Sequence, residues 1–228
     1  MWITRFLTSS IGQKWVMALT GLFLITFLIV HLAGNLAILA GDGGQAFNVY
    51  ADFMVHNPLI KTVSFGLYAF IIIHAIQGIL IALKNRKANG KAYAKKDTKG
   101  SWASKNMALL GILVLAFLFI HMGDFWFKAK FGGEGAIAAV DYGNGNIKDL
   151  YSRVVISFDQ LWIVIAYLIG LLALAFHLLH GFQSAFQTLG LNHHKYNPLI
   201  RGIGIAYGIL VPLGYAVLPV YVYLQQNT

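Results

Sequence analysis

Cysteine is absent from this chain of 228 residues, and charged residues make up only 11% of it. Without cysteine the chain has no disulfide, no thiolate-ligated iron–sulfur cluster and no C-x-x-C-H attachment site for haem. The charged fraction is about half that of an average soluble domain, whereas 58% of the residues are hydrophobic. This composition indicates a membrane protein whose metal ligands, if any, are histidines or oxygen atoms.

Five stretches are long and apolar enough to cross a bilayer, which takes about 20 residues in a helix. The first is too long for a cleaved signal peptide, and no clear cleavage pattern follows it. We therefore expect an all-α integral membrane protein in which residues 1–228 form one bundle of five transmembrane helices. The expected spans are residues 14–39, 59–83, 106–127, 158–187 and 200–224. Four tryptophans near the ends of these spans fit an interfacial belt: Trp15, Trp102, Trp126 and Trp162.

The charged residues between the spans predict the orientation. The N-terminal segment and the second and fourth connections are basic, and Asp97 is their only acid. The opposite connections hold the other acids. Because cytoplasmic loops are enriched in lysine and arginine, we expect a cytoplasmic N-terminus. The net charge of +9 is thus explained by topology and not by nucleic-acid binding. The basic run Lys84–Lys105 also suggests a docking surface for a cytoplasmic partner.

Histidine is the main functional signal, because an ionisable residue inside a membrane span is costly. The first three spans contain His31, His74 and His121, and the fourth contains both His177 and His180. Imidazole is a common axial ligand of non-covalently bound haem. Two haems of the b type would need four such ligands, which these helices can supply.

Depth in the membrane sorts these histidines into two levels. Measured along its helix, His31 lies roughly 25 Å from the basic end, and His121 roughly 24 Å. His74 lies only roughly 15 Å from that end. The fourth helix places His177 and His180 in the same inner half. We therefore expect His31 with His121 at an outer site, and His74 with His177 or His180 at an inner site.

Two glycines favour His177 as the fourth ligand. Gly78 follows His74 by four residues, and Gly181 follows His177 by four. Residues four apart share a helix face, and a glycine there leaves room for a flat macrocycle against the backbone. Serine stands at the matching position after His180, so His180 is kept as the alternative ligand.

Short motifs in this order resemble one family, the five-helix, two-haem cytochrome b subunit of succinate dehydrogenase/fumarate reductase, often called the cytochrome b558 type. The resemblance runs from Ser9 to about Pro219. The motifs are Ser9–Gly12, Thr20–Phe23, His31–Asn35, Ala46–Asn48, Phe53–Met54, His74–Gly78 and Phe176–Ser184.

The resemblance implies that His31 and His121 hold the haem distal to the catalytic subunits. It implies that His74 and His177 hold the proximal haem. It further implies a flavoprotein and an iron–sulfur subunit as partners on the cytoplasmic face, menaquinone as the quinone, and the bacterial inner membrane as the location. The third helix offers little motif around His121.

Quinone chemistry moves protons with electrons, so a quinone site needs a titratable group beside the redox centre. At the outer end the candidates are Asp52, His56 and Asp124, with Asn48 and Asn57 as hydrogen-bonding neighbours. An inner quinone site near Ser10, Gln13 and Gln183 is the alternative.

Two other functions are weighed against this one. Another quinol-linked respiratory anchor would also bind two haems, although the membrane subunit of nitrate reductase takes its ligands from two helices. A small-solute transporter would have helices broken near mid-membrane. Pro212 and the spacing of glycines between Gly202 and Gly214 are compatible with such a break.

Overall fold

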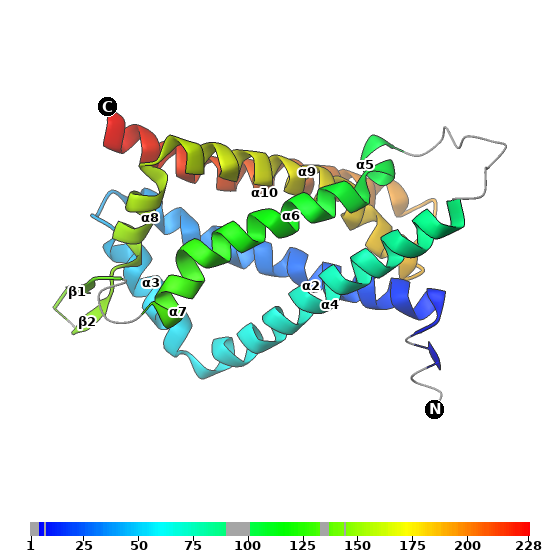
Figure 1. Cartoon of the computed structure of the whole chain (residues 1–228), viewed down its shortest axis with the longest axis horizontal. Coiled ribbons are helices and arrows are strands. Elements are labelled where there is room, and N and C mark those ends of the chain that lie inside the picture. Colours follow the sequence, from blue (N-terminus) through cyan, green and yellow to red (C-terminus); the bar gives the residue numbers. More distant parts are fainter. Residues whose placement is uncertain (1–4, 7, 90–100, 133–136, 144) are drawn as a thin grey trace.

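The computed structural model describes residues 5–6, 8–89, 101–132, 137–143 and 145–228, and it is almost entirely helical. Five helical segments are long and apolar enough to span a membrane, so the chain is a multi-pass membrane protein with an all-α bundle (Figure 1). The spans are Ser10–Ala40, Pro58–Lys87, Met107–Phe131, Leu161–Thr188 and Asn197–Asn227. Part of the basic run Lys84–Lys105 lies outside the described residues, namely Lys91, Lys95, Lys96, Asp97 and Lys99. Glu134, in the connection after the third span, also lies outside them.

The helices that build these spans start and stop for local reasons. The first is α2 (Ser10–Asn35), which begins where the Ser9 side chain accepts a hydrogen bond from the Gly12 N–H. It tightens into η1 (Leu36–Ala40), and Gly41 ends the turn with a φ of 72°. The second is α4 (Pro58–Asn89). The Asn57 side chain accepts from the backbone N–H groups of Leu59 and Ile60 at its start, so Asn57 acts as a helix cap.

The remaining three spans differ in regularity. The third consists of α6 (Met107–His121), the π-helical segment η2 (Met122–Phe127) and α7 (Lys128–Phe131). The fourth is α9 (Leu161–Thr188) and the fifth is α10 (Asn197–Asn227), which continues through two internal prolines. The fourth span begins at Leu161, three residues after the expected start, because Phe158 ends a separate helix, α8 (Leu150–Phe158).

Helices α9 and α10 form the best-packed part of the bundle. On α10, a Cβ at Gly204 would lie 2.8 Å from the Phe182 ring, and one at Gly208 would lie 2.9 Å from Leu179. Glycine is therefore required at both positions for the close approach of the two helices, as in small-residue membrane interfaces. In the most apolar window of each span, 44% of α9 is buried but none of α4.

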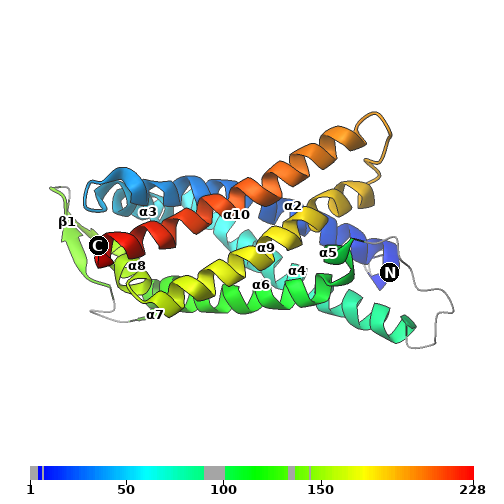
Figure 2. The same ribbon diagram turned by 90° about the horizontal axis from the view of Figure 1, so that it is seen from above.

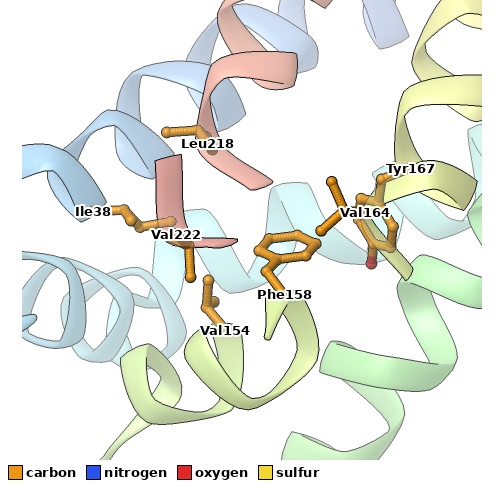
Figure 3. Packing of buried hydrophobic residues seen from close by; sticks show 7 residues of the cluster. All are labelled: Ile38, Val154, Phe158, Val164, Tyr167, Leu218 and Val222. Carbon is orange, nitrogen blue, oxygen red and sulfur yellow. The ribbon is translucent and has the colours of Figure 1, made fainter. Parts of the chain in front are cut away.

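One end of the bundle, here called the capped end, is covered by short elements. They are α3 (Gln45–His56), the hairpin β1 (Ala139–Asp141) with β2 (Asn146–Lys148), and α8. Val154 and Phe158 of α8 enter a buried cluster with residues from η1, α9 and α10 (Figure 3). Burial of such apolar side chains fixes α8 across the end of the bundle.

The opposite end, here called the basic end, carries the N-terminal segment, α5 (Trp102–Lys105) and the turn between α9 and α10 (Figure 2). Every acidic residue that the structure describes lies at the capped end instead. The described cations of the basic end are Arg5, Lys14, Lys84, Arg86, Lys87, Lys105, Lys195 and Arg201.

Candidate functional site

Four histidines from four helices meet in two pairs inside the bundle. The rings of His31 on α2 and His121 on α6 have centroids 5.8 Å apart. The rings of His74 on α4 and His177 on α9 have centroids 6.2 Å apart. The structure thus brings together the residues that the depth comparison paired, and it is the His177 ring that lies against His74. His180, one turn further along α9, is half-buried.

The two pairs lie at two levels of the bundle. His121 packs against Tyr167 of α9 at a ring distance of 6.1 Å, and Tyr167 precedes His177 by roughly 15 Å of helix. On α2, Thr20 contacts His74, and Thr20 precedes His31 by roughly 16 Å of helix. Two different helices therefore give the same separation between an inner pair, His74 with His177, and an outer pair, His31 with His121.

The inner pair is held by a hydroxyl. The Thr20 hydroxyl lies 3.1 Å from His74 Nδ1 and 2.7 Å from the Val16 carbonyl oxygen. A hydroxyl has one proton, so it donates to the carbonyl and accepts from Nδ1–H of His74. That assignment leaves Nε2 of His74 with a free lone pair. His177 differs, because its Nδ1 is buried without a hydrogen-bond partner.

The outer pair is held by side chains of α2 and α9. The Tyr167 hydroxyl lies 3.4 Å from His121 Nδ1, and the Asn35 amide nitrogen lies 3.2 Å from His31 Nδ1. Tyr215 of α10 approaches the His31 ring at 5.8 Å, and its hydroxyl donates to the Leu28 carbonyl oxygen at 2.7 Å. Aromatic rings thus surround the outer pair and keep it from water.

The glycines expected beside the inner pair differ in their surroundings. A Cβ at Gly181 would meet nothing within 4 Å, whereas one at Gly78 would lie 3.3 Å from the Met17 methyl group. Gly21 of α2 faces the inner pair directly, since a Cβ there would lie 3.3 Å from His74 Cε1. Open space therefore exists beside Gly181, and the flexible Met17 side chain occupies the space beside Gly78.

Asp124 lies in the π-helical segment, which begins directly after His121. Its Oδ1 accepts from Lys128 Nζ at 2.8 Å and from Arg153 of α8, while its Oδ2 is buried without a partner. A π-helical turn is rare and frequently found at functional sites. Asp124 is thus the quinone candidate closest in sequence to the outer pair.

The other two quinone candidates lie on α3. Asp52 and His56 form an ion pair of 3.2 Å between neighbouring turns, and their side chains are 35% and 73% exposed. The structure therefore pairs them with each other on α3, at the capped end of the bundle. Their role stays a prediction.

Asn48 has a structural function that its sequence position did not reveal. It is fully buried, donates to Asp149 Oδ1 at 2.8 Å and Tyr142 Oη at 3.0 Å, and accepts from the Tyr151 N–H. These bonds hold α3 to the hairpin and α8. Burial raises the pKa of Asp149, but hydrogen bonds from Ser152 and Asn48 outweigh it and leave that pKa lowered. Because both hydrogens of its amide are already donated, Asn48 has no donor left for a quinone.

Sequence reasoning missed three polar residues around the pairs: Thr20, Tyr167 and Gln77, whose Oε1 is buried without a partner beside the inner level. A helical signal existed for one of them. Thr20 stands eleven residues before His31, about three full turns and so nearly the same face, whereas Tyr167 stands ten residues before His177 and is turned from it by about 80°. In the described part of the chain, no group of three or more His, Asp or Glu side chains converges as a metal site.

Comparisons with known proteins add no identification. No protein-family model matches the chain, and neither the curated proteins nor the solved structures give a match. The function must therefore be inferred from the histidine pairs and from the short motifs of the sequence.

Proposed function

We propose that this chain is the di-haem cytochrome b membrane anchor of a succinate:quinone oxidoreductase, a succinate dehydrogenase/fumarate reductase. It would carry electrons between the iron–sulfur subunit and menaquinone. One observation carries the proposal: four helices each supply one histidine, and the rings meet as two pairs at two levels. A single buried histidine would be explained by helix packing, but two matched pairs are not.

The spacing within each pair suits ligation of one iron from both sides. A metal–nitrogen bond of about 2 Å on each side places two imidazole centroids about 6 Å apart. The centroid distances of 5.8 and 6.2 Å agree with that value. Bound haem would supply one-electron redox chemistry at each level.

The protein's own contribution is to orient these ligands. With its own proton donated to the Val16 carbonyl oxygen, the Thr20 hydroxyl would accept a hydrogen bond from His74 Nδ1–H and leave the Nε2 lone pair available for iron. The Tyr167 hydroxyl is placed to do the same for His121. Such partners fix the tautomer and raise the basicity of a ligating histidine. The aromatic residues around the outer pair exclude water and so lower the local dielectric constant.

The partners follow from charge and topology. A positive-inside orientation would put the basic end in the cytoplasm of a bacterium, with the protein in the inner membrane. The flavoprotein and iron–sulfur subunits would dock there, on the cations of the basic end, without entering lipid. No nucleic-acid partner is needed to explain these charges.

The transporter alternative predicts spans interrupted near mid-membrane. Helix α10 contains Pro212 and Pro219 but is continuous from Asn197 to Asn227. This continuity favours a fixed bundle over a transport pathway through α10. A different quinol-linked anchor would share the two haems and would differ in its soluble partners.

Purification from native membranes tests the proposal. We expect two b-type haems per chain by pyridine haemochrome analysis, a reduced-minus-oxidised b-type spectrum, and co-purifying flavoprotein and iron–sulfur subunits. A colourless chain after expression with haem supplied would overturn the proposal. Two haems with other co-purifying soluble subunits would show that the chain is the membrane anchor of a different quinol-linked respiratory enzyme.

A further inference from the structure

A pocket of about 330 Å³ opens at the basic end, where the start of α2 meets the end of α9. It lies apart from both histidine pairs. Six residues line it: Ile11, Lys14, Trp15, Ser184, Gln187 and Thr188.

Helical spacing makes this pocket a groove between two strips of side chains. The lining residues of α2 are Ile11, Lys14 and Trp15, which follow the i, i+3, i+4 pattern of one helix face. On α9 the residues Ser184, Gln187 and Thr188 repeat that pattern, beginning about two turns after the proposed ligand His177. One face of α2 and one face of α9 therefore each contribute three side chains to the lining of the pocket.

The charge of the pocket is positive and uncompensated. Lys14 is exposed, and within the described residues it takes part in no ion pair. Its neighbour Lys84 is different, because its ammonium group donates to the buried Gln13 side chain at 2.7 Å. Since all described acids lie at the capped end, Lys14 has no carboxylate at its own end of the described structure.

The polar groups opposite Lys14 suit an oxygen-rich anion. Ser184 and Gln187 offer a hydroxyl and an amide that make no side-chain hydrogen bond among the described residues. Thr188 already donates to the Ser184 carbonyl oxygen at 2.8 Å. An ammonium group with hydroxyl and amide donors around it matches the oxygens of a phosphate ester.

The apolar part of the pocket places it at the membrane interface. Ile11 is 67% exposed and Trp15 is 40% exposed. Trp15 also begins the apolar run of its span, where tryptophan sits at the level of lipid headgroups. A ligand with a phosphate group and hydrocarbon chains would satisfy both the polar and the apolar lining.

We propose that this pocket binds the headgroup of an anionic phospholipid, with the phosphate at Lys14 and an acyl chain along Ile11 and Trp15. Basic pockets between transmembrane helices bind such headgroups. The lipid would seal the contact between α2 and α9 at the basic end. This inference does not depend on haem.

Quenching of tryptophan fluorescence by brominated lipid tests the site. The full chain is reconstituted in phosphatidylcholine vesicles containing either brominated phosphatidylglycerol or brominated phosphatidylcholine. The Trp15 signal is obtained by subtracting the emission of a Trp15→Phe variant. We expect Trp15 to be quenched at a lower mole fraction of phosphatidylglycerol than of phosphatidylcholine.

Charge variants test whether Lys14 causes the preference for phosphatidylglycerol over phosphatidylcholine. Lys14→Gln should lower the preference for phosphatidylglycerol about fivefold, and Lys14→Arg should keep it. Lys105→Gln removes the same charge from the same end of the bundle, outside the pocket, and should leave the preference unchanged. Circular dichroism checks that each variant retains its helices.

Three results would overturn the proposal. The first is equal quenching by the two lipids in the unmodified chain. The second is relief of quenching by millimolar inorganic phosphate, which would assign the pocket to a soluble anion. The third is relief by menaquinone added to the vesicles, which would assign it to quinone. None of these results bears on the haem content, so the two proposals fail separately.

Discussion

Arg153 of α8 forms an ion pair with Asp124, three residues beyond His121 on the neighbouring span. Both side chains are nearly buried, at 16% and 13% exposed, and Arg153 Nε also donates to the Asp124 carbonyl oxygen. A helix lying across the capped end is thereby tied to the π-helical turn that follows a proposed haem ligand. Lys128 pairs with the same carboxylate oxygen from the other side.

Breaking this pair should cost stability, because it leaves the nearly buried Asp124 carboxylate with Lys128 as its one remaining ion-pair partner among the described residues. We expect Arg153→Met to destabilise the protein by about 2 kcal/mol, somewhat less than the cost of removing the sole partner of a buried charge. The double variant Arg153→Met/Asp124→Asn should recover part of that loss. Thermal unfolding in detergent, read as a double-mutant cycle, measures the coupling. Strictly additive losses would show that the two residues do not interact.

Replacing Thr20 should weaken the inner haem site without unfolding α2. Thr20→Val keeps the shape of the side chain but removes the acceptor of the His74 Nδ1 proton. Partners of this kind are worth 10–100-fold in metal affinity. Thr26→Val is the matched control, because the Thr26 hydroxyl bonds only its own helix, at the Leu22 carbonyl. Equal haem retention in the two variants would contradict the assigned role of Thr20.

The choice between the two histidines of α9 is decided by haem counting. His177→Ala should lose the inner haem, because His177 is the residue whose ring lies 6.2 Å from His74. His180→Ala should keep both haems. The pyridine haemochrome yield per chain measures the difference. If His180→Ala loses one haem and His177→Ala keeps two, the fourth ligand is His180.

Quinone-linked turnover should depend on Asp124 more than on the surface pair of α3. Asp124→Asn is expected to lower turnover at least tenfold while both haems are retained, since a proton-transfer group contributes typically 10²–10⁴-fold. Asp52→Asn and His56→Ala should stay within about twofold, because the His56 side chain is exposed and the Asp52 side chain is about one-third exposed. Normal turnover in all three variants would place the quinone at the inner end, near Ser10, Gln13 and Gln183.

Acid should weaken the hydrogen bonds that hold the capped end. The pKa of Asp149 is lowered in the folded protein, so its contribution to stability is present above its ordinary pKa and is lost as the pH falls through the lowered value. Asp149→Asn removes this dependence. The stability difference between the native chain and this variant should therefore shrink below about pH 4. A difference that stays constant from about pH 6 to pH 3 would exclude Asp149 as the source.

The spans and the histidine pairing were accessible from sequence because both follow from helix geometry. A run of apolar residues fixes a span, and a rise of 1.5 Å per residue fixes the depth of His31 or His74. The two outer helices α3 and α8 were not foreseen. They are short, carry polar residues such as Asn48 and Arg153, and lie at the end of the bundle, so no long apolar run marks them.

Contacts between distant segments explain the remaining differences. Asn48 was grouped with the quinone candidates because its position beside a membrane end is all that sequence gives. Its partners Tyr142 and Asp149 are about a hundred residues away, and no local pattern connects them. The π-helical turn at Asp124 likewise meets its ion-pair partner Arg153 on another helix, 29 residues further along the chain.

The outer and inner levels share one continuous helix, α9, which carries Tyr167 beside one pair and His177 in the other. Loop length, lipid thickness and partner binding therefore leave their separation unchanged. A single inserted residue between them would turn everything beyond it by about 100°, which would remove one of the two residues from the bundle interior. This ten-residue interval should therefore tolerate no change in length, and its Gly170 should tolerate no larger residue, because a Cβ there would lie 2.4 Å from the Phe117 ring.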